Sequence, residues 1–344
     1  MNLQSILRPS IRNMKAYTSA RDEFQNRADD LVFLDANENP YSNNLNRYPD
    51  PQQRLLKHEL SHLKTISTEQ ILIGNGSDEV LDLLIRACCE PNQNSILTMP
   101  PTYGMYGVLA RLNTVENLEV PLTSEFQIDT KSVLNAVNSN TKMILICSPN
   151  NPSGNVLDNT AIEQIIIQFK GLVIIDEAYV DFSKHPSWLS RLDDFPNLVV
   201  TQTLSKAYGL AGIRLGICYA SSKIISVLNK IKPPYNINIL TQNAALKGIL
   251  KQNIVKRQIE MILSERDILI HKLNQLHFVK TVFPSDSNFV LIRVDDANLR
   301  YRQLIQNNII VRNRHGQLYC DNCLRITVGT PEDNLKLIQI LNNL

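Results

Sequence analysis

The chain has 344 residues, of which 43% are hydrophobic and 20% charged, a composition typical of a globular protein long enough for two domains. Its formal net charge of +2 does not favour nucleic acid or an acidic membrane surface as a partner. No apolar run approaches the length of a membrane span, and the amino terminus lacks the apolar segment of a signal peptide, so we expect a soluble, cytoplasmic protein.

Residues 1–35 are expected to form an arm rather than a domain. The segment around Tyr17 mixes basic and aromatic residues without strong helical periodicity, and a short strand is predicted at residues 31–34. Turn-forming residues follow, and Asp50 is predicted to cap a helix that begins at Pro51.

That helix contains His58–His62, which matches the H-E-x-x-H pattern of zinc proteases. At about 100° per residue, Leu56, Leu60 and Leu63 fall on one face of the helix and the two histidines on the other. A catalytic zinc site needs an enclosed cleft and a third ligand. We therefore expect the leucines to pack inward, the histidines to face water, and no metal to bind.

Residues 70–79 predict a strand, a glycine turn and the start of a helix. The dinucleotide-binding pattern is matched only in part, because Glu79 stands where its third glycine would be. Free N–H groups of Gly76, Ser77 and Asp78 at the helix start could bind one phosphate. An ordinary helix capped by Ser77 or Asp78 explains this segment equally well.

The pattern then alternates between apolar strands and amphipathic helices. Strands are predicted at residues 95–99, 115–120, 142–147, 172–175, 198–200 and 213–219. Helices are predicted after the cap residue Asp129 and at residues 158–169. This alternation over about 150 residues predicts an α/β fold with a mostly parallel, doubly wound sheet.

The remainder of the chain predicts a smaller α+β domain. A helix at about residues 250–276 leads into it, so the expected boundaries are 36–277 for the large domain and 278–344 for the small one. Its predicted strands are residues 288–294, 309–312 and 323–328, and its helices lie near 299–306 and 331–344. Cys320 and Cys323 form a single C-x-x-C pair, so a zinc knuckle is not expected.

Polar residues follow three consecutive strands of the predicted large sheet. They are Asn151, then Asp176 with Tyr179, then Ser205 with Lys206. In a doubly wound sheet such strand ends line one crevice. A partly desolvated lysine there has a lowered pKa and becomes a nucleophile, which favours a Schiff base between Lys206 and an aldehyde cofactor. The alternative for Lys206 alone is a solvated loop lysine.

Pyridoxal phosphate needs this set of groups. Asp176 is placed to keep the ring nitrogen protonated, and Tyr179 and Asn151 to donate to the ring oxygen. A helix start with a hydroxyl and a guanidinium suits the phosphate, and a tyrosine suits the ring face. The expected cofactor contacts are Gly76, Ser77, Asp78, Tyr103, Asn151, Asp176, Tyr179, Thr203, Ser205, Lys206 and Arg214, and the expected catalytic residues are Lys206, Asp176 and Tyr179.

Over nearly its full length the chain resembles the fold-type I pyridoxal-phosphate aminotransferases. The motifs that carry the resemblance are Leu34–Pro40, Asn46–Asp50, Pro100–Tyr106, Ser148–Pro152, Asp176–Tyr179, Thr203–Lys206 with Arg214, and Cys323–Gly329. The motifs around Lys206 and Asp176 are typical of the whole superfamily. Those near the two ends of the chain resemble the members that act on histidinol phosphate.

The resemblance implies a homodimer in which Tyr48 reaches the cofactor phosphate of the neighbouring subunit. It also places Tyr17, Asn151, Arg312 and Arg325 around the substrate, with the arm joining the small domain there. The implied reaction converts L-histidinol phosphate and 2-oxoglutarate into imidazole-acetol phosphate and L-glutamate. The alternative is a related enzyme of aromatic amino acids or threonine phosphate.

Overall fold

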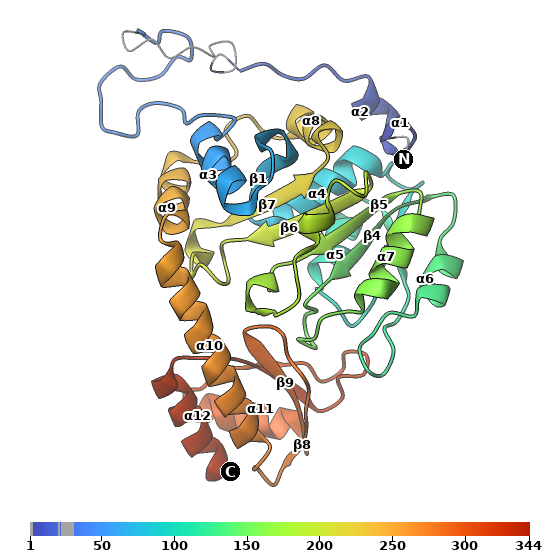
Figure 1. Ribbon diagram of the computed structural model, residues 1–344, viewed down its shortest axis with the longest axis vertical. Coiled ribbons are helices and arrows are strands. Elements are labelled where there is room, and N and C mark those ends of the chain that lie inside the picture. Colours follow the sequence, from blue (N-terminus) through green and yellow to red (C-terminus); the bar gives the residue numbers. More distant parts are fainter. Residues whose placement is uncertain (1–2, 20, 22–30) are drawn as a thin grey trace.

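The computed structural model of the protein describes residues 3–19, 21 and 31–344. A large domain with a central sheet and a smaller domain are connected by the long helix α10, Gln252–Leu273 (Figure 1). The amino-terminal helices α1, Leu3–Ile6, and α2, Pro9–Arg12, lie at the end of the large domain remote from the small one (Figure 1).

The large sheet has seven strands in the order β1-β7-β6-β5-β4-β2-β3. Their bounds are β1 Ile71–Asn75, β2 Ser95–Thr98, β3 Glu116–Glu119, β4 Thr141–Cys147, β5 Leu172–Asp176, β6 Leu198–Thr203 and β7 Leu215–Ala220. Strand β7 runs antiparallel to both of its neighbours, and the other pairings are parallel. The mostly parallel sheet predicted from the sequence is confirmed.

Helices cover both faces of this sheet, which explains why its central strands are apolar throughout. Along β5, Val173 and Ile175 join one core cluster, whereas Leu172 and Ile174 join the other. The first cluster includes helices α3 Arg54–Lys64, α7 Asn159–Gln168 and α9 Ile239–Ile249. The second includes α4 Ser77–Cys88, α5 Met105–Leu112 and α8 Ser222–Ile231. The remaining helix of this domain, α6, spans Thr130–Ala136.

The small domain is built on an antiparallel sheet in the order β10-β11-β9-β8. Its elements are β8 Val279–Val282, β9 Phe289–Val294, α11 Ala297–Gln306, β10 Arg312–Asn313, β11 Cys323–Thr327 and α12 Pro331–Asn342. Helix α12 begins with Thr330 and Asp333 in a reciprocal capping box, with Pro331 at the first helical position. The small domain is α+β, as predicted.

Several predicted element boundaries were wrong. Residues 31–34 do not form a strand. Helix α3 begins at Arg54 rather than Pro51, because Gln53 adopts a left-handed conformation with φ 47°. The N-cap residue is therefore Gln53 rather than Asp50, although the Asp50 carboxylate accepts a hydrogen bond from the Arg54 N–H at 2.7 Å. Strand β8 had not been predicted.

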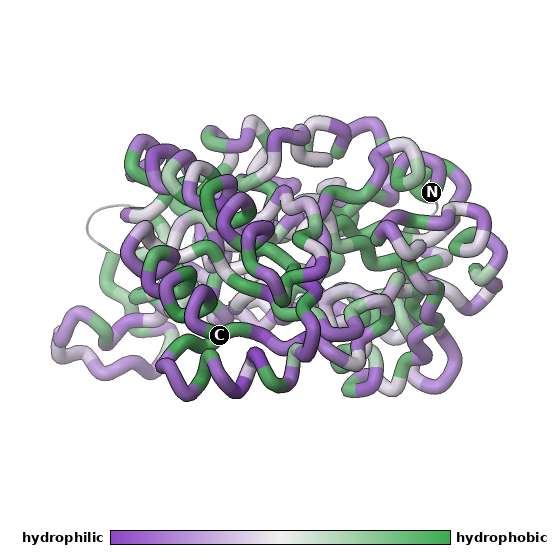
Figure 2. Tube along the Cα trace, turned by 90° about the horizontal axis from the view of Figure 1, so that it is seen from below, coloured by the Kyte–Doolittle hydropathy of each residue, from purple (hydrophilic) through white to green (hydrophobic). Residues whose placement is uncertain are grey.

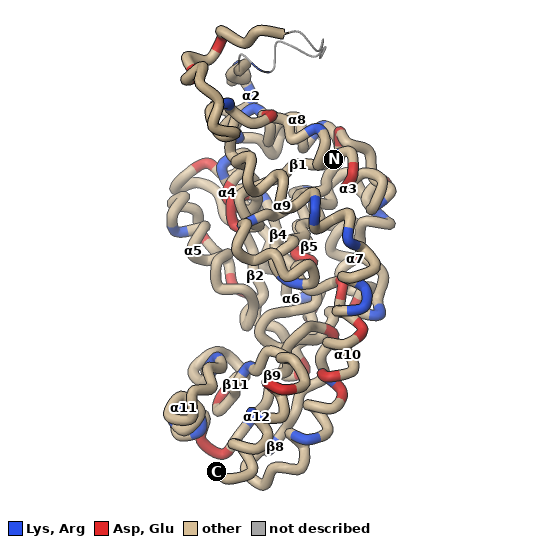
Figure 3. Tube along the Cα trace, turned by 90° about the vertical axis from the view of Figure 1, so that its left-hand side faces the viewer, with Lys and Arg blue, Asp and Glu red and all other residues tan. Residues whose placement is uncertain are grey.

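The distribution of polar and charged residues over the surface agrees with the globular composition of the sequence. Hydrophilic segments dominate the periphery in Figure 2, and basic and acidic residues are interspersed over both domains in Figure 3. Within the described part of the chain, no helix combines the length and the apolar character that crossing a bilayer requires.

Candidate active site

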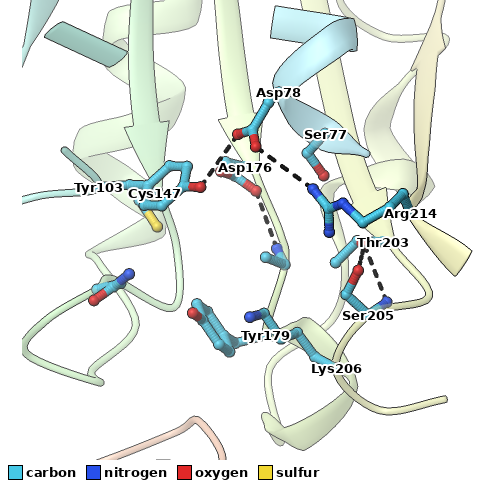
Figure 4. Close-up of a pocket in the computed structure, with 12 residues that line it drawn as sticks. Ser77, Asp78, Tyr103, Cys147, Asp176, Tyr179, Thr203, Ser205, Lys206 and Arg214 are labelled. Atoms are coloured by element: carbon cyan, nitrogen blue, oxygen red, sulfur yellow. Dashed lines mark hydrogen bonds and ion pairs between the residues drawn. The ribbon is translucent and has the colours of Figure 1, made fainter. Parts of the chain in front are cut away.

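A pocket lies at the carboxyl ends of the large-sheet strands, where the sequence predicted it. Its lining residues are Ser77, Asp78, Tyr103, Cys147, Asn151, Asp176, Ala178, Tyr179, Thr203, Ser205, Lys206 and Arg214. Figure 4 shows Lys206 beside Tyr179, with Ser77 and Arg214 on the far side of the pocket. The parallel strands β4, β5 and β6 bring the polar residues that follow them to one edge of the sheet.

Asp176 is the last residue of β5 and is only 4% exposed. The Tyr106 hydroxyl, from helix α5, donates to one carboxylate oxygen at 2.9 Å, and the Ala178 N–H donates to the other at 3.2 Å. Burial raises the pKa of Asp176, while these two hydrogen bonds act to lower it. A cationic ring nitrogen facing Asp176 would further favour its ionised form.

The sequence did not assign any role to Tyr106. It lies within the motif Pro100–Tyr106, in the first turn of α5, whereas Tyr103 precedes the helix. No sequence signal indicated which of the two hydroxyls would face Asp176. The Tyr103 hydroxyl donates instead to Asp78, at 3.2 Å.

Lys206 lies in the turn that follows β6 and is open to the pocket. Partial desolvation by the pocket walls, followed by the charge of Arg325, lowers its pKa, although Asp176 opposes this shift. Its Nζ atom lies 5.6 Å from the centre of the Tyr179 ring. A lysine with a lowered pKa, facing a buried carboxylate across a pocket, is the arrangement that an aldehyde cofactor requires.

The start of helix α4 is built for close approach of Arg214. Gly76 has φ +80°, and a Cβ atom there would lie 2.7 Å from the Arg214 Nη2 atom. A Cβ atom on Gly216 would lie 2.3 Å from the backbone nitrogen of Ser77. These glycines let the helix start, the arginine and strand β7 come together.

The hydroxyl groups at this end of the pocket are also fixed. The Thr203 hydroxyl donates to the Leu215 carbonyl at 2.9 Å and accepts from the Ser205 N–H at 3.1 Å. The Arg214 guanidinium lies 3.7 Å from the Asp78 carboxylate. At this separation its N–H groups remain available to bind another anion. With the N–H groups of the helix start, Ser205 and Arg214 form a donor set that fits a phosphate.

The small domain contributes Arg325 from β11. Its guanidinium donates to the Asn151 side chain and lies 5.0 Å from the centre of the Phe289 ring. Burial lowers the pKa of Arg325, and Tyr179 acts in the opposite direction. Asn151 and Arg325 therefore join the two domains beside the pocket, as expected of substrate-binding residues. Arg312 pairs with Arg325 in the sheet but is more exposed.

Tyr17 and Tyr48 do not line the pocket of the single chain. Tyr17 is 74% exposed, and Tyr48 is 51% exposed and stacks on Tyr235 at 4.4 Å. The Tyr48 N–H donates to Glu38 at 2.6 Å, which fixes the backbone of this segment.

The H-E-x-x-H sequence has the orientation that its periodicity predicted. Leu56 and Leu60 are buried, whereas His58 and His62 are exposed, with their Nε2 atoms 3.1 Å apart. Within residues 3–19, 21 and 31–344, no group of three side chains is arranged to hold a metal ion.

Comparison with known proteins connects this geometry to a family. Residues 24–341 match the family described as aminotransferase class I and II. The chain is 55% identical over 343 residues to a histidinol-phosphate aminotransferase of Flavobacterium psychrophilum, covering 100% of this chain and 99% of that protein.

Two solved structures share the fold. A histidinol-phosphate aminotransferase of Sinorhizobium meliloti in complex with pyridoxal-5'-phosphate superimposes with a TM-score of 0.81 at 23% identity, covering 88% of this chain and 84% of that one. An L-threonine-O-3-phosphate decarboxylase of Porphyromonas gingivalis gives a TM-score of 0.73 at 23% identity, covering 87% and 93%. The fold alone therefore does not distinguish transamination from decarboxylation.

Proposed function

The chain belongs to the class I and II aminotransferases, and from this premise we propose that its pocket transfers an amino group between L-histidinol phosphate and 2-oxoglutarate. The products are imidazole-acetol phosphate and L-glutamate, and histidine biosynthesis uses the reaction in the opposite direction. The enzyme is a pyridoxal-phosphate-dependent transaminase. The observation that carries the substrate assignment is the 55% identity to a histidinol-phosphate aminotransferase over the whole chain.

Bound pyridoxal phosphate supplies an aldehyde that accepts the amino group and a ring that delocalises the electrons of the breaking bond. Lys206 would hold the aldehyde carbon, and Asp176 would keep the ring nitrogen protonated. Tyr179 and Asn151 would donate to the ring oxygen. The N–H groups at the start of α4, Ser205 and Arg214 would bind the phosphate, and residues carrying these donors line one pocket.

Lys206 would also serve as the base that removes the proton from the substrate Cα and as the acid that returns it. Its lowered pKa increases the fraction of free amine at neutral pH, and a free amine is what this proton transfer needs. Because both half-reactions use the same pocket, the amino donor and the acceptor must occupy it in turn, which predicts ping-pong kinetics.

One anion site must accept a phosphate in one half-reaction and a carboxylate in the other. We assign this site to Arg325 and Arg312 with Tyr17, because a guanidinium binds both oxyanions through paired hydrogen bonds. Arg325 and its partner Asn151 border the cofactor pocket in the single chain. Tyr17 and Arg312 do not line the pocket of the single chain, and their assignment to this site rests on the resemblance of their motifs to those of the family.

A cytoplasmic homodimer is part of the same proposal, with Tyr48 contributed to the partner subunit's cofactor site. An unusual number of large apolar side chains is exposed near Tyr48, including Leu34 at 88% and Tyr41 at 82%. Exposed apolar groups concentrated in one segment are typical of a protein interface.

The test is substrate profiling of the purified holoenzyme. L-histidinol phosphate, phenylalanine and threonine phosphate are each supplied with 2-oxoglutarate, and glutamate and carbon dioxide are measured. We expect glutamate from histidinol phosphate at the highest kcat/KM and no carbon dioxide from threonine phosphate. A higher kcat/KM for phenylalanine, or release of carbon dioxide, would replace the proposed substrate with one of the alternatives.

A further inference from the structure

Three arginines of the small domain lie on one face of its sheet. Arg312 is paired with Arg325 across strands β10 and β11, and the Arg314 N–H continues this ladder by donating to the Cys323 carbonyl at 2.9 Å. Directly paired residues share a face of an antiparallel sheet, as do residues two apart on one strand. Arg314 therefore projects on the same side as Arg325, whose guanidinium contacts Asn151 at the pocket.

Arg314 extends further into the protein than its sequence neighbour Arg312. It is partly buried, whereas Arg312 is exposed. Its Nε atom is buried and has no hydrogen-bond partner among the described residues, and the same is true of the Nε atom of Arg325. Arg314 does not itself line the pocket, but it lies on the sheet face from which Arg325 reaches the lining residue Asn151.

Neither the Arg314 nor the Arg325 guanidinium forms an ion pair with a carboxylate of the described residues. Desolvation, followed by the charges of Arg325 and Arg312, lowers the pKa of Arg314 to about 10. No carboxylate is among the groups that most influence the pKa of Arg314 or Arg325. Buried charges in proteins are normally paired, so two neighbouring, partly buried cations without an acid are best explained by a ligand with more than one negative charge.

We propose that Arg314 is a specificity-determining residue that binds, together with Arg325, the phosphate group of the phosphorylated amine substrate. This inference rests on the proposed function. A carboxylate has one charge and two oxygens, and one bidentate arginine satisfies it. A phosphate monoester has a charge of about −1.5 to −2 at neutral pH and three acceptor oxygens. Arg314 adds a further guanidinium to the site of Arg325 and Arg312, and this extra donor strengthens binding of the phosphate more than binding of glutamate.

The test compares Arg314→Gln with the matched control Arg302→Gln, which removes an exposed arginine of the same domain from helix α11. Both holoenzymes react in single half-reactions with L-histidinol phosphate, unphosphorylated L-histidinol and L-glutamate. The visible absorbance of the cofactor is followed. We expect Arg314→Gln to lower kcat/KM for histidinol phosphate by about 10- to 100-fold, mainly through KM, as is typical of a lost hydrogen bond to a charged group.

The values for histidinol and glutamate should change by less than about 3-fold, below the loss expected for a charge-assisted hydrogen bond. The control should resemble the wild type with all three substrates. Equal losses with all three would show that Arg314 only supports the fold of the pocket, and unchanged values would show that it does not contact the phosphate. Either result overturns the inference.

Two further measurements keep the outcome decisive. Inorganic phosphate should inhibit the glutamate half-reaction more weakly in Arg314→Gln than in the wild type, and equal inhibition would contradict the assignment. If Arg314→Gln does not fold, Arg314→Lys preserves the charge without the planar fork and should show the same selective loss, in smaller degree. A wild-type enzyme that reacts with glutamate but not with histidinol phosphate would instead overturn the proposed function, and this inference with it.

Discussion

Asp176 shows how a single buried carboxylate can be kept available for chemistry. Burial raises its pKa, and the Tyr106 hydroxyl is the strongest of the hydrogen bonds that oppose this effect. Tyr106 is itself fully enclosed, with 1% exposure, so water cannot replace its donor. We therefore regard Tyr106 as a positioning residue that acts through Asp176.

The first prediction concerns Tyr106→Phe. Loss of this donor should raise the pKa of Asp176 and weaken its hold on the ring-nitrogen proton, lowering kcat by about 10-fold, the equivalent of one hydrogen bond to a charged group. The measurement is kcat with the cofactor saturating. Tyr219→Phe is the matched control, because Tyr219 is also buried but its hydroxyl has no hydrogen-bond partner in the described part of the chain. Equal activity of the two variants would contradict the role of Tyr106.

The second prediction concerns the pH dependence of Lys206. Only the free amine attacks an aldehyde, so the rate at which apoenzyme takes up cofactor should rise with pH through the Lys206 pKa. Desolvation and then Arg325 lower that pKa, because each disfavours the protonated form. In Arg325→Gln one of these effects is lost, the pKa rises, and the rate profile should move to higher pH. A profile that stays in place would show that Arg325 does not act on Lys206.

At the scale of an element, the turn before helix α4 controls where the amino-terminal N–H groups of that helix point. It begins directly after β1, and its free N–H groups face the pocket only because Gly76 turns the chain with a positive φ. The helix start would serve as a phosphate site only with Arg214 close by, and Gly76 leaves the space for that guanidinium. The turn, the helix and the arginine therefore form one unit.

The third prediction follows from this unit. Gly76→Ala should weaken cofactor binding and lower stability by about 1 kcal/mol or more, because φ +80° is strained for alanine and the new Cβ would displace Arg214. The measurements are cofactor affinity and thermal unfolding with and without cofactor. Gly104→Ala is the control, since it has φ −63° and no atom within 4 Å of its Cβ position. If Gly76→Ala binds cofactor normally, the turn is not part of the phosphate site.

At the scale of the whole molecule, the site is assembled from distant parts of the chain. The cofactor groups come from the large domain, whereas Arg325 comes from the small domain and contacts Asn151 at the boundary. In the single chain Tyr48 contributes neither to the cofactor groups nor to the contact between Arg325 and Asn151, and it stacks on Tyr235 at the surface. A second subunit is the simplest way for Tyr48 to reach a cofactor.

The fourth prediction tests that assembly by subunit mixing. Lys206→Ala should be inactive while remaining folded, and Tyr48→Ala should bind cofactor weakly. Mixed dimers of the two should contain one site with both an intact Lys206 and an intact Tyr48 from the partner subunit, so activity should reappear on mixing. The measurement is turnover after the subunits exchange, with sedimentation to establish the dimer. Activity that does not exceed that of Tyr48→Ala alone would contradict sharing of Tyr48.

The sequence by itself determined the sheet and the set of groups at its edge. Apolar periodicity located β4, β5 and β6, and parallel strands place the residues after them at one edge, so Asn151, Asp176 and Lys206 were expected together and lie together. Strand positions could be predicted because apolar periodicity is a property of the local sequence. The shared edge could be predicted because connections between parallel strands are almost always right-handed, which leaves few possible arrangements of the sheet.

Only the tertiary structure decided which side chains face one another across elements. The contact of Tyr106 with Asp176 depends on how α5 packs on the sheet, and the orientation of Arg314 depends on the register of β10 with β11. A one-residue shift in register reverses the face of every side chain on a strand, and hydrophobic patterning constrains a two-residue edge strand only weakly. The sequence could therefore predict a cofactor pocket, but the position of Arg314 on the same sheet face as Arg325 became visible only through strand pairing.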